Sequence, residues 1–162
     1  MHLTSGIKVV LMVFFALSVG CTETKQDFCK HLSLEEAQAF DPTISNTEMR
    51  QTKRILYCVY KNETSDRLFV SVDRAMKYSP KDFLKVLAKN SPDEYEEILS
   101  LSGAGIDSAA LFLGNDDELQ LDFLIAQNNE YSVTIRAREV TSTSSGKIDK
   151  LQSIATKVLS RI

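Results

Sequence analysis

The sequence predicts an α+β domain in which an antiparallel five-stranded sheet packs with three to four helices, in the order α-ββ-αα-βββ-α. Apolar and polar residues alternate over residues 67–75, 118–127 and 130–140 with the period of two that half-buried strands have. Serine residues precede apolar residues spaced three and four apart, which indicates helices before, between and after the strand regions. Strands with one apolar face favour an antiparallel sheet that is covered on one side.

The first helix is expected over residues 34–40. Ser33 and Glu36 have the spacing of a capping box, in which each side chain accepts a backbone N–H of the other residue. Pro42 should end the helix, because the residue before a proline disfavours the helical conformation. The apolar side of this helix consists of Leu34, Ala37 and Phe40.

Two strands joined as a hairpin are expected next. Residues 55–60 are rich in β-branched and aromatic side chains, and the polar residues 62–66 suit a turn. The alternation in residues 67–75 then divides that strand into two faces. The apolar face carries Leu68, Val70 and Val72, and the polar face carries Ser71 and Asp73.

Two further helices are predicted over residues 80–89 and 92–101. Both begin with a serine cap, a proline at the first helical position and an acid in the first turn. Gly103 and Gly105 should end the second helix. The side chains expected to be buried are Phe83, Leu84, Leu87, Tyr95, Ile98 and Leu99.

A three-stranded meander and a closing helix complete the predicted domain. The strands are expected over residues 109–113, 118–127 and 130–140, and Asn128-Asn129 suits a tight turn that needs positive φ. Leu119, Leu121, Phe123 and Ile125 should share one face of the middle strand. After a polar loop, a helix over residues 147–162 places on one stripe Ile148, Leu151, Ile154, Ala155, Val158, Leu159 and Ile162.

The first 21 residues predict export. Lys8 precedes the apolar residues 9–17, which are too few to span a membrane, and small residues stand directly before Cys21. This ending resembles the lipobox of bacterial lipoproteins, whose cysteine is acylated and becomes the first mature residue. The resemblance implies that Cys21 is lipidated and holds the protein on a membrane of the bacterial cell envelope.

Two alternatives to lipidation remain open. Ala16 and Ser18 fit an ordinary signal peptidase site, and cleavage there would leave Cys21 free. A buried N-terminal helix with a packing cysteine is the third possibility. With lipidation, the chain divides into a signal peptide over residues 1–20, a lipid-anchored tether over residues 21–28 and a single domain over residues 29–162.

The charge of the chain argues against a nucleic-acid partner. Without residues 1–20, the chain keeps 18 Lys and Arg against 22 Asp and Glu. Basic residues dominate residues 48–89, whereas residues 90–130 contain ten acids and no basic residue. This distribution favours opposite solvated faces, or charge complementarity between helices and sheet, over a ligand surface. It also lacks the basic, aromatic-interleaved stripe of nucleic-acid-binding proteins.

Cys29 and Cys58 are expected to form a disulfide. They are the remaining pair once Cys21 is assigned to the lipid, and disulfides persist in exported proteins. Closing the loop between them should stabilise the domain by about 3 to 4 kcal/mol. A metal site is not expected, because His31 is the one histidine outside the signal and the cysteines are not closely spaced. No cofactor is expected either.

Arg50, Lys53 and Arg54 form the candidate binding segment. Residues 47–53 have little apolar periodicity and lie between the two cysteines, which is typical of a presented loop. Its positive charge could attract an acidic protein partner or anionic lipid headgroups. The alternative is that these side chains only solvate a loop or pair with the acidic residues 93–97.

Several motifs together resemble a class of small envelope lipoproteins of unknown function, best known from actinobacteria. These motifs are a cysteine before a short helix with Glu35-Glu36, a second cysteine in the first strand, Gly103-Ala104-Gly105 before a strand that contains Ala109, and a final amphipathic helix. Some members have the α/β/α sandwich of PsbP-like proteins. The resemblance therefore implies that fold, and it implies no catalytic residues.

No sequence motif indicates a specific catalysed reaction. The glycines at 103 and 105 lack the Lys-Ser/Thr ending of a phosphate loop, and no Gly-x-Ser-x-Gly sequence is present. Asn115-Asp116-Asp117-Glu118 is interpreted as a hairpin turn, because further cation ligands are missing. We therefore expect a non-catalytic, membrane-anchored binding or accessory module for a protein, peptide or small ligand. The alternative is an exported hydrolase that uses acidic residues in the 93–122 region.

Overall fold

The computed structural model describes residues 28–52, 55–92, 94–101, 106–114 and 119–162. Within these residues a seven-stranded antiparallel sheet, in the order β1-β2-β3-β7-β6-β5-β4, packs with three α-helices and a short 3-10 helix. In chain order the elements are η1 Phe28–His31, α1 Leu34–Phe40, β1 Asn46–Gln51, β2 Leu56–Lys61, β3 Asp66–Arg74, α2 Pro80–Asn90, β4 Tyr95–Leu101, β5 Asp107–Leu113, β6 Gln120–Gln127, β7 Tyr131–Ala137 and α3 Ser145–Leu159. The predicted α+β class fits this fold, whereas the predicted five-stranded sheet is wrong.

The first additional strand is β1, where a loop was expected over residues 47–53. It pairs with β2 along its whole length, from Asn46 opposite Lys61 to Gln51 opposite Leu56. Its sequence, NTEMRQ, contains a single large apolar residue, so it shows no strand periodicity. Such a polar sequence is tolerated because β1 is an edge strand with a neighbour on one side only.

The second additional strand is β4, where a helix was expected over residues 92–101. Ser91-Pro92 has the residues of a helix start, but the chain that follows pairs with β5 at the other edge of the sheet. Ile98 and Leu99 show which structure is present. The predicted helix was expected to bury both on its apolar side, yet Ile98 packs beneath α2 and Leu99 packs against the core on the opposite side of the sheet.

Two of the three helices predicted from serine caps, those over residues 34–40 and 80–89, are confirmed as α1 and α2. The Ser33 hydroxyl accepts the N–H of Glu36 at 3.2 Å, and the Glu36 carboxylate accepts the N–H of Ser33 at 3.0 Å. Helix α2 begins after Ser79, whose hydroxyl accepts the N–H of Asp82. The predicted apolar stripe of α3 is buried from Ile148 to Leu159. Ile162 is the exception, because it lies beyond the end of the helix and is 40% exposed.

The turn between β6 and β7 forms in a different way from that predicted. Asn128 uses its side-chain oxygen to accept the N–H groups of Glu130 and Tyr131, at 2.9 and 2.8 Å. Among the described non-glycine residues, Glu139 alone has positive φ. The expectation of positive φ at Asn128-Asn129 is therefore wrong, because a side-chain hydrogen bond closes this turn.

The disulfide expected between Cys29 and Cys58 is present, with the two Cα atoms 5.5 Å apart. Two residues further along β2, the Tyr60 hydroxyl donates a hydrogen bond to the Leu32 carbonyl at 2.7 Å. Both side chains leave the same face of β2, so they attach η1 and the start of α1 to the second strand. Arg161 binds the same region, because its guanidinium donates to the His31 carbonyl and to the Glu36 carboxylate.

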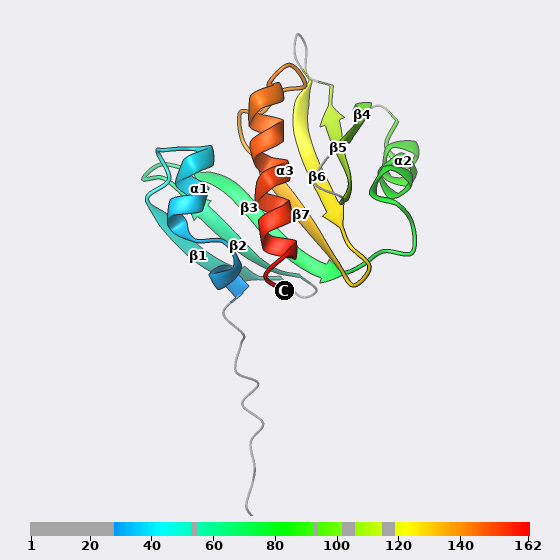
Figure 1. Cartoon of the computed structure of the whole chain (residues 1–162). Coiled ribbons are helices and arrows are strands. Elements are labelled where there is room, and N and C mark those ends of the chain that lie inside the picture. Colours follow the sequence, from blue (N-terminus) through cyan, green and yellow to red (C-terminus); the bar gives the residue numbers. More distant parts are fainter. Residues whose placement is uncertain (1–27, 53–54, 93, 102–105, 115–118) are drawn as a thin grey trace, which may run out of the picture.

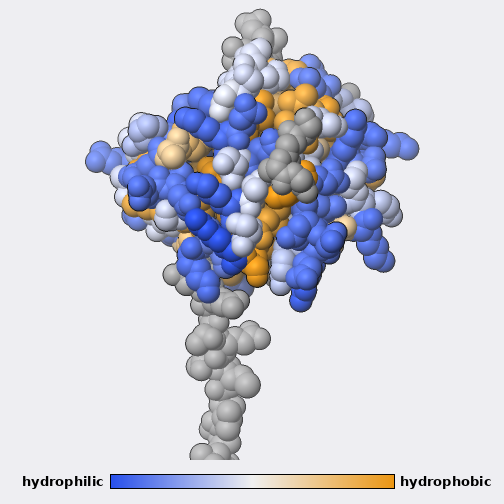
Figure 2. Space-filling view, viewed as in Figure 1, coloured by the Kyte–Doolittle hydropathy of each residue, from blue (hydrophilic) through white to orange (hydrophobic). Residues whose placement is uncertain are grey.

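The two faces of the sheet are covered unequally. Helices α1 and α3 cover one face, where the largest group of buried apolar residues lies. In the view of Figure 2 this side of the molecule is largely hydrophilic, and apolar side chains show mainly in a band beside α3. On the other face, α2 packs on β4, β5 and β6. None of the described helices packs on that face of β1, β2, β3 and β7.

None of the helices within the described ranges is long and apolar enough to cross a membrane.

Candidate functional site

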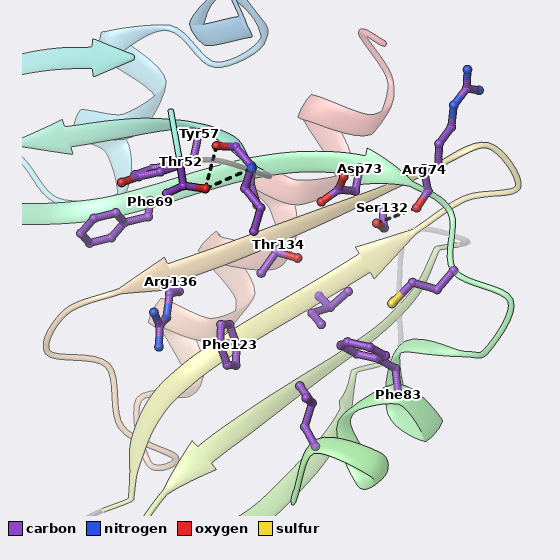
Figure 3. A pocket seen from close by; sticks show the side chains of 15 residues that line it. Thr52, Tyr57, Phe69, Asp73, Arg74, Phe83, Phe123, Ser132, Thr134 and Arg136 are labelled. Atoms are coloured by element: carbon purple, nitrogen blue, oxygen red, sulfur yellow. Dashed lines mark hydrogen bonds between the residues drawn. The ribbon is translucent and has the colours of Figure 1, made fainter. Parts of the chain in front are cut away.

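The half of the sheet that α2 leaves uncovered carries a groove of about 730 Å³ (Figure 3). Its floor is made by β2, β3, β7 and β6, and one side is closed by α2 and the segment that leads into it. Pockets that bind small molecules have volumes of roughly 300 to 1,000 Å³ and are lined mainly by apolar side chains. The groove meets both criteria and is the candidate site.

The first wall of the groove comes from β2, from β3 and from the residue that precedes β2. Tyr57 and Phe69 face the groove, because the alternation of their strands sends Cys58 and Val70 into the core on the other side. The two rings lie 6.4 Å apart between centroids and are tilted by 40°. Ile55, just before β2, extends this wall and is 44% exposed. This wall therefore leaves large apolar side chains within reach of a ligand.

The second wall comes from β6, α2 and the segment between β3 and α2. Phe83 and Leu87 are half-buried where α2 borders the groove, and Met76 lies in the segment before the helix. Gln127 at the end of β6 holds this segment in place. Its side-chain oxygen accepts the N–H of Met76 at 3.2 Å, and its amide group donates to the Tyr78 carbonyl at 3.0 Å. The second wall is thus attached to the sheet on both sides of Met76.

A polar strip runs along the floor between the two walls. In the register of β3 and β7, Ser71 lies opposite Thr134, and Asp73 lies opposite Ser132. Directly opposite residues point to the same face, so all four side chains enter the groove. The Ser132 hydroxyl donates to the Arg74 carbonyl at 3.2 Å. A ligand in the groove would therefore meet hydrogen-bonding groups below it and apolar groups beside it.

One end of the groove is formed by Arg136, whose guanidinium lies 4.4 Å from the centre of the Phe123 ring. The same guanidinium donates to the carboxylate of Asp122 from both Nε and Nη2. Asp122 is only 6% exposed, and its second oxygen accepts the Tyr95 hydroxyl at 3.0 Å. Burial, followed by this hydrogen bond to Asp122, raises the pKa of Tyr95. The charges of Arg136 and Asp122 therefore offset each other.

The position of Asp122 corrects the expected face of β6. Leu111 of β5 pairs with Phe123, but the next residue, Phe112, pairs with Leu121, so the register shifts by one residue at Asp122. This irregularity sends Leu121 into the core beneath α3, whereas Phe123 and Ile125 face the groove and α2. The prediction that all four apolar residues from Leu119 to Ile125 share one face is wrong.

The predicted binding residue Arg50 is used in ion pairs at the edge of the sheet. Its Nη1 lies 2.7 Å from Asp66, its Nη2 lies 3.1 Å from Glu48, and Lys61 lies 2.7 Å from Glu48. Hydrogen bonds from Arg50 and then from Lys61 lower the pKa of Glu48 to about 2. Arg50 thus pairs with Glu48 of its own strand and with Asp66 of β3, and none of its described ion pairs involves residues 93–97. Its role in binding stays a prediction. Lys53 and Arg54 lie outside the described residues, as does Cys21.

The acids of the 93–122 region are spread over β4, β5 and β6. Glu96 and Glu97 lie in β4 at the sheet edge, Asp107 begins β5, and Asp122 is paired with Arg136. Asp93 and the acids at 116–118 lie outside the described residues. Within the described ranges, no group of three or more His, Cys, Asp or Glu side chains could hold a metal ion.

The groove residues were missed by sequence reasoning, although one signal pointed to them. The alternation that predicts Leu68 and Val70 in the core leaves Phe69 on the face expected to be polar. Tyr57 likewise precedes a core residue, Cys58, and therefore points to the opposite face of its strand. Aromatic residues on the second face of two neighbouring strands indicate a surface that is neither core nor fully solvated.

Comparisons with protein-family models, with curated proteins and with solved structures found no match. The function is therefore inferred from the groove itself.

Proposed function

We propose that the protein is a non-catalytic, lipid-anchored module of the bacterial cell envelope that binds a small amphipathic ligand in the groove. The observation that carries this proposal is the uncovered, mainly apolar groove of about 730 Å³ on the outer face of the sheet. Four aromatic rings line it, from Tyr57, Phe69, Phe83 and Phe123. A concave apolar surface of this size is costly to leave in water, so its persistence supports a ligand site.

Binding should need little rearrangement of the protein. The floor of the groove is a hydrogen-bonded sheet, and Gln127 fixes the segment that carries Met76. A preformed site loses little conformational entropy when the ligand enters. The apolar walls would supply affinity at roughly 25 cal/mol per Å² of buried apolar surface, and the polar floor would orient the ligand.

Two features of the groove support binding without turnover. Asp73 is the one carboxylate that the described part of the chain contributes to the lining. The hydroxyls of Ser71, Ser132 and Thr134 have no histidine beside them in that lining, and a hydroxyl nucleophile needs a neighbouring base. A hydrolase would require an acid and a base that converge on one bond.

The anchoring part of the proposal rests on Cys21 and on the disulfide. Disulfides such as Cys29–Cys58 persist in oxidising compartments, which supports an exported protein. A lipid on Cys21 would then hold the domain close to the membrane through the short tether of residues 21–28, where an envelope protein could also contact it. Replacing Cys21→Ser should release the protein from the membrane fraction. Mass spectrometry showing a mature N-terminus at Val19 would contradict lipidation.

The binding part can be tested with a neutral fluorescent probe, N-phenyl-1-naphthylamine. The parent protein should bind the probe and raise its fluorescence, whereas Ser71→Trp should fill the groove and abolish the increase. Ser153→Trp is the matched control, because Ser153 is exposed on α3, which packs on the opposite face of the sheet. Circular dichroism should show that both variants fold. Equal probe binding by the parent and Ser71→Trp would overturn the proposal.

A further inference from the structure

Asp73 differs from the other charged side chains of the groove. Arg136 is paired with Asp122, and Arg74 places its guanidinium 5.5 Å from the centre of the Tyr131 ring. Figure 3 shows the Arg74 guanidinium directed away from the rest of the lining. Asp73 is exposed and makes no ion pair or hydrogen bond with any of the described residues. Within the described lining, Asp73 is therefore a negative charge without a partner among apolar walls.

We infer that the groove selects amphipathic cations, that is, ligands with a protonated amine on an aliphatic or aromatic body. This inference rests on the proposed function and names the class of ligand. The amine would lie against the Asp73 carboxylate, which in its ionised form accepts hydrogen bonds without donating any and suits a donor with a positive charge. The apolar body would lie between the two walls.

The neighbours of Asp73 suit the same ligand. Ser71 is two residues away on the same face of β3, and Thr134 lies opposite it. Neither hydroxyl makes a hydrogen bond to another described residue, so both oxygens can accept from an ammonium group. Tyr57 lies opposite Ser71 on the other side, which places an aromatic ring beside the same spot. Aromatic faces attract cations and add to the effect of the carboxylate.

The other end of the groove disfavours an anion. Arg136 is the cation that faces the lining there, but two of its nitrogen atoms already donate to Asp122. An anionic ligand would compete with this carboxylate, which is buried and would lose its partner. The net charge of the chain, −3 at pH 7, also favours the approach of a cation. Local and overall charge thus favour the same sign of ligand.

The test uses three probes with one apolar body and different head groups: 4-phenylbutylamine, 4-phenylbutan-1-ol and 4-phenylbutyrate. Ligand-observed NMR titrations at pH 7 and low salt use the full mature protein in phospholipid nanodiscs, with empty nanodiscs as the blank. The amine should bind about fivefold more tightly than the alcohol, the ratio expected from one accessible ion pair, and the carboxylate should bind more weakly than the alcohol.

Asp73→Asn should remove the preference, so that the amine binds as weakly as the alcohol while the affinity for the alcohol stays unchanged. Asp149→Asn is the matched control, since Asp149 is an exposed acid on α3 and should leave all three affinities unchanged. Equal affinity of the parent for all three probes would overturn the charge preference and leave the groove as a binding site. Failure of all three probes to bind would instead count against the proposed function itself.

Discussion

The outer face of the sheet has two halves, one covered by α2 and one that no described helix covers. Over β4, β5 and β6, the residues packed beneath α2 are apolar, and Leu84 of α2 is fully buried on Ala109, Leu111 and Ile125. Over β2, β3 and β7, the outward residues combine aromatic rings with a polar strip, and no described helix covers them. The apolar part of this face is covered by α2, a helix of the same chain. A mixed surface can exchange water for a ligand.

The largest effect on stability is expected from the disulfide, because it attaches η1 to the half of the sheet that lacks an outer helix. Replacing Cys29 and Cys58 by serine should lower the free energy of unfolding by about 3 to 4 kcal/mol, measured by urea denaturation. Hydrogen exchange should quicken more in β1, β2 and β3 than in β4, β5 and β6, since η1 contacts β1 and β2. Equal acceleration in both halves would show that they unfold as one unit.

The second effect compares matched truncations on the two halves. Leu84→Ala should cost about 3 kcal/mol of stability, because it opens a cavity beneath α2. Phe69→Ala should cost about 1 kcal/mol, since its side chain is only half-buried, yet it should weaken probe binding in the groove. Urea denaturation and the naphthylamine titration measure the two quantities. If Phe69→Ala were as destabilising as Leu84→Ala, the groove would be part of the core.

A third, smaller effect concerns the pH dependence of stability, and it arises on the inner face of the sheet, away from both outer halves. Glu36 joins α1 to Arg161, which follows the end of α3, and hydrogen bonding from Arg161 lowers the pKa of the Glu36 carboxyl to about 2. Because this pKa is depressed on folding, its stabilisation is present above about pH 4.5 and is lost as the pH falls towards 2. Glu36→Gln should cost about 1 kcal/mol at pH 7, allowing for solvent screening of the pair, and little at pH 2.

The control for this prediction is Glu35→Gln, because Glu35 is an exposed neighbour in the same first turn. Melting temperatures from pH 2 to 7 should show a reduced pH dependence for Glu36→Gln and an unchanged one for Glu35→Gln. Identical pH curves for the parent and Glu36→Gln would contradict the role of this ion pair. Groove binding at pH 7 should be the same in all three proteins.

Local sequence signals predicted the parts of the fold that depend on local interactions. The serine caps located α1 and α2, and apolar spacing located α3. Alternation located β3, β6 and β7, β-branched and aromatic residues located β2, and β5 was expected over residues 109–113; each of these strands has at least one apolar face. The edges were missed for a physical reason. An edge strand can be as polar as β1, and the helix-like start before β4 is overridden by pairing with β5.

The groove could not be predicted because it depends on which strands α2 covers. That choice follows from the length of the segment after β3 and from the hydrogen bonds of Gln127, which lies 51 residues from Met76 in the chain. The register shift at Asp122 also sets the site, since it turns Phe123 towards the groove. The disulfide was predictable because assigning Cys21 to a lipid leaves two cysteines to pair, and this assignment of Cys21 stays a prediction. The lining required the tertiary arrangement.

The smallest effect is expected at the edge of the uncovered half, for Arg50→Ser. Arg50 lies in β1 opposite Tyr57, so it borders the groove side of the sheet, but its guanidinium is held by Glu48 and Asp66. These pairs are partly exposed, and such pairs contribute little to stability, so the urea concentration at the midpoint of unfolding should stay almost unchanged. The affinity for 4-phenylbutylamine should stay the same, whereas Asp73→Asn lowers it.

Lys85→Ser, on the exposed side of α2, provides the matched loss of one positive charge. A strong loss of binding in Arg50→Ser alone would show that the edge of the sheet takes part in recognition, and it would restore the interpretation of the basic segment as a binding surface.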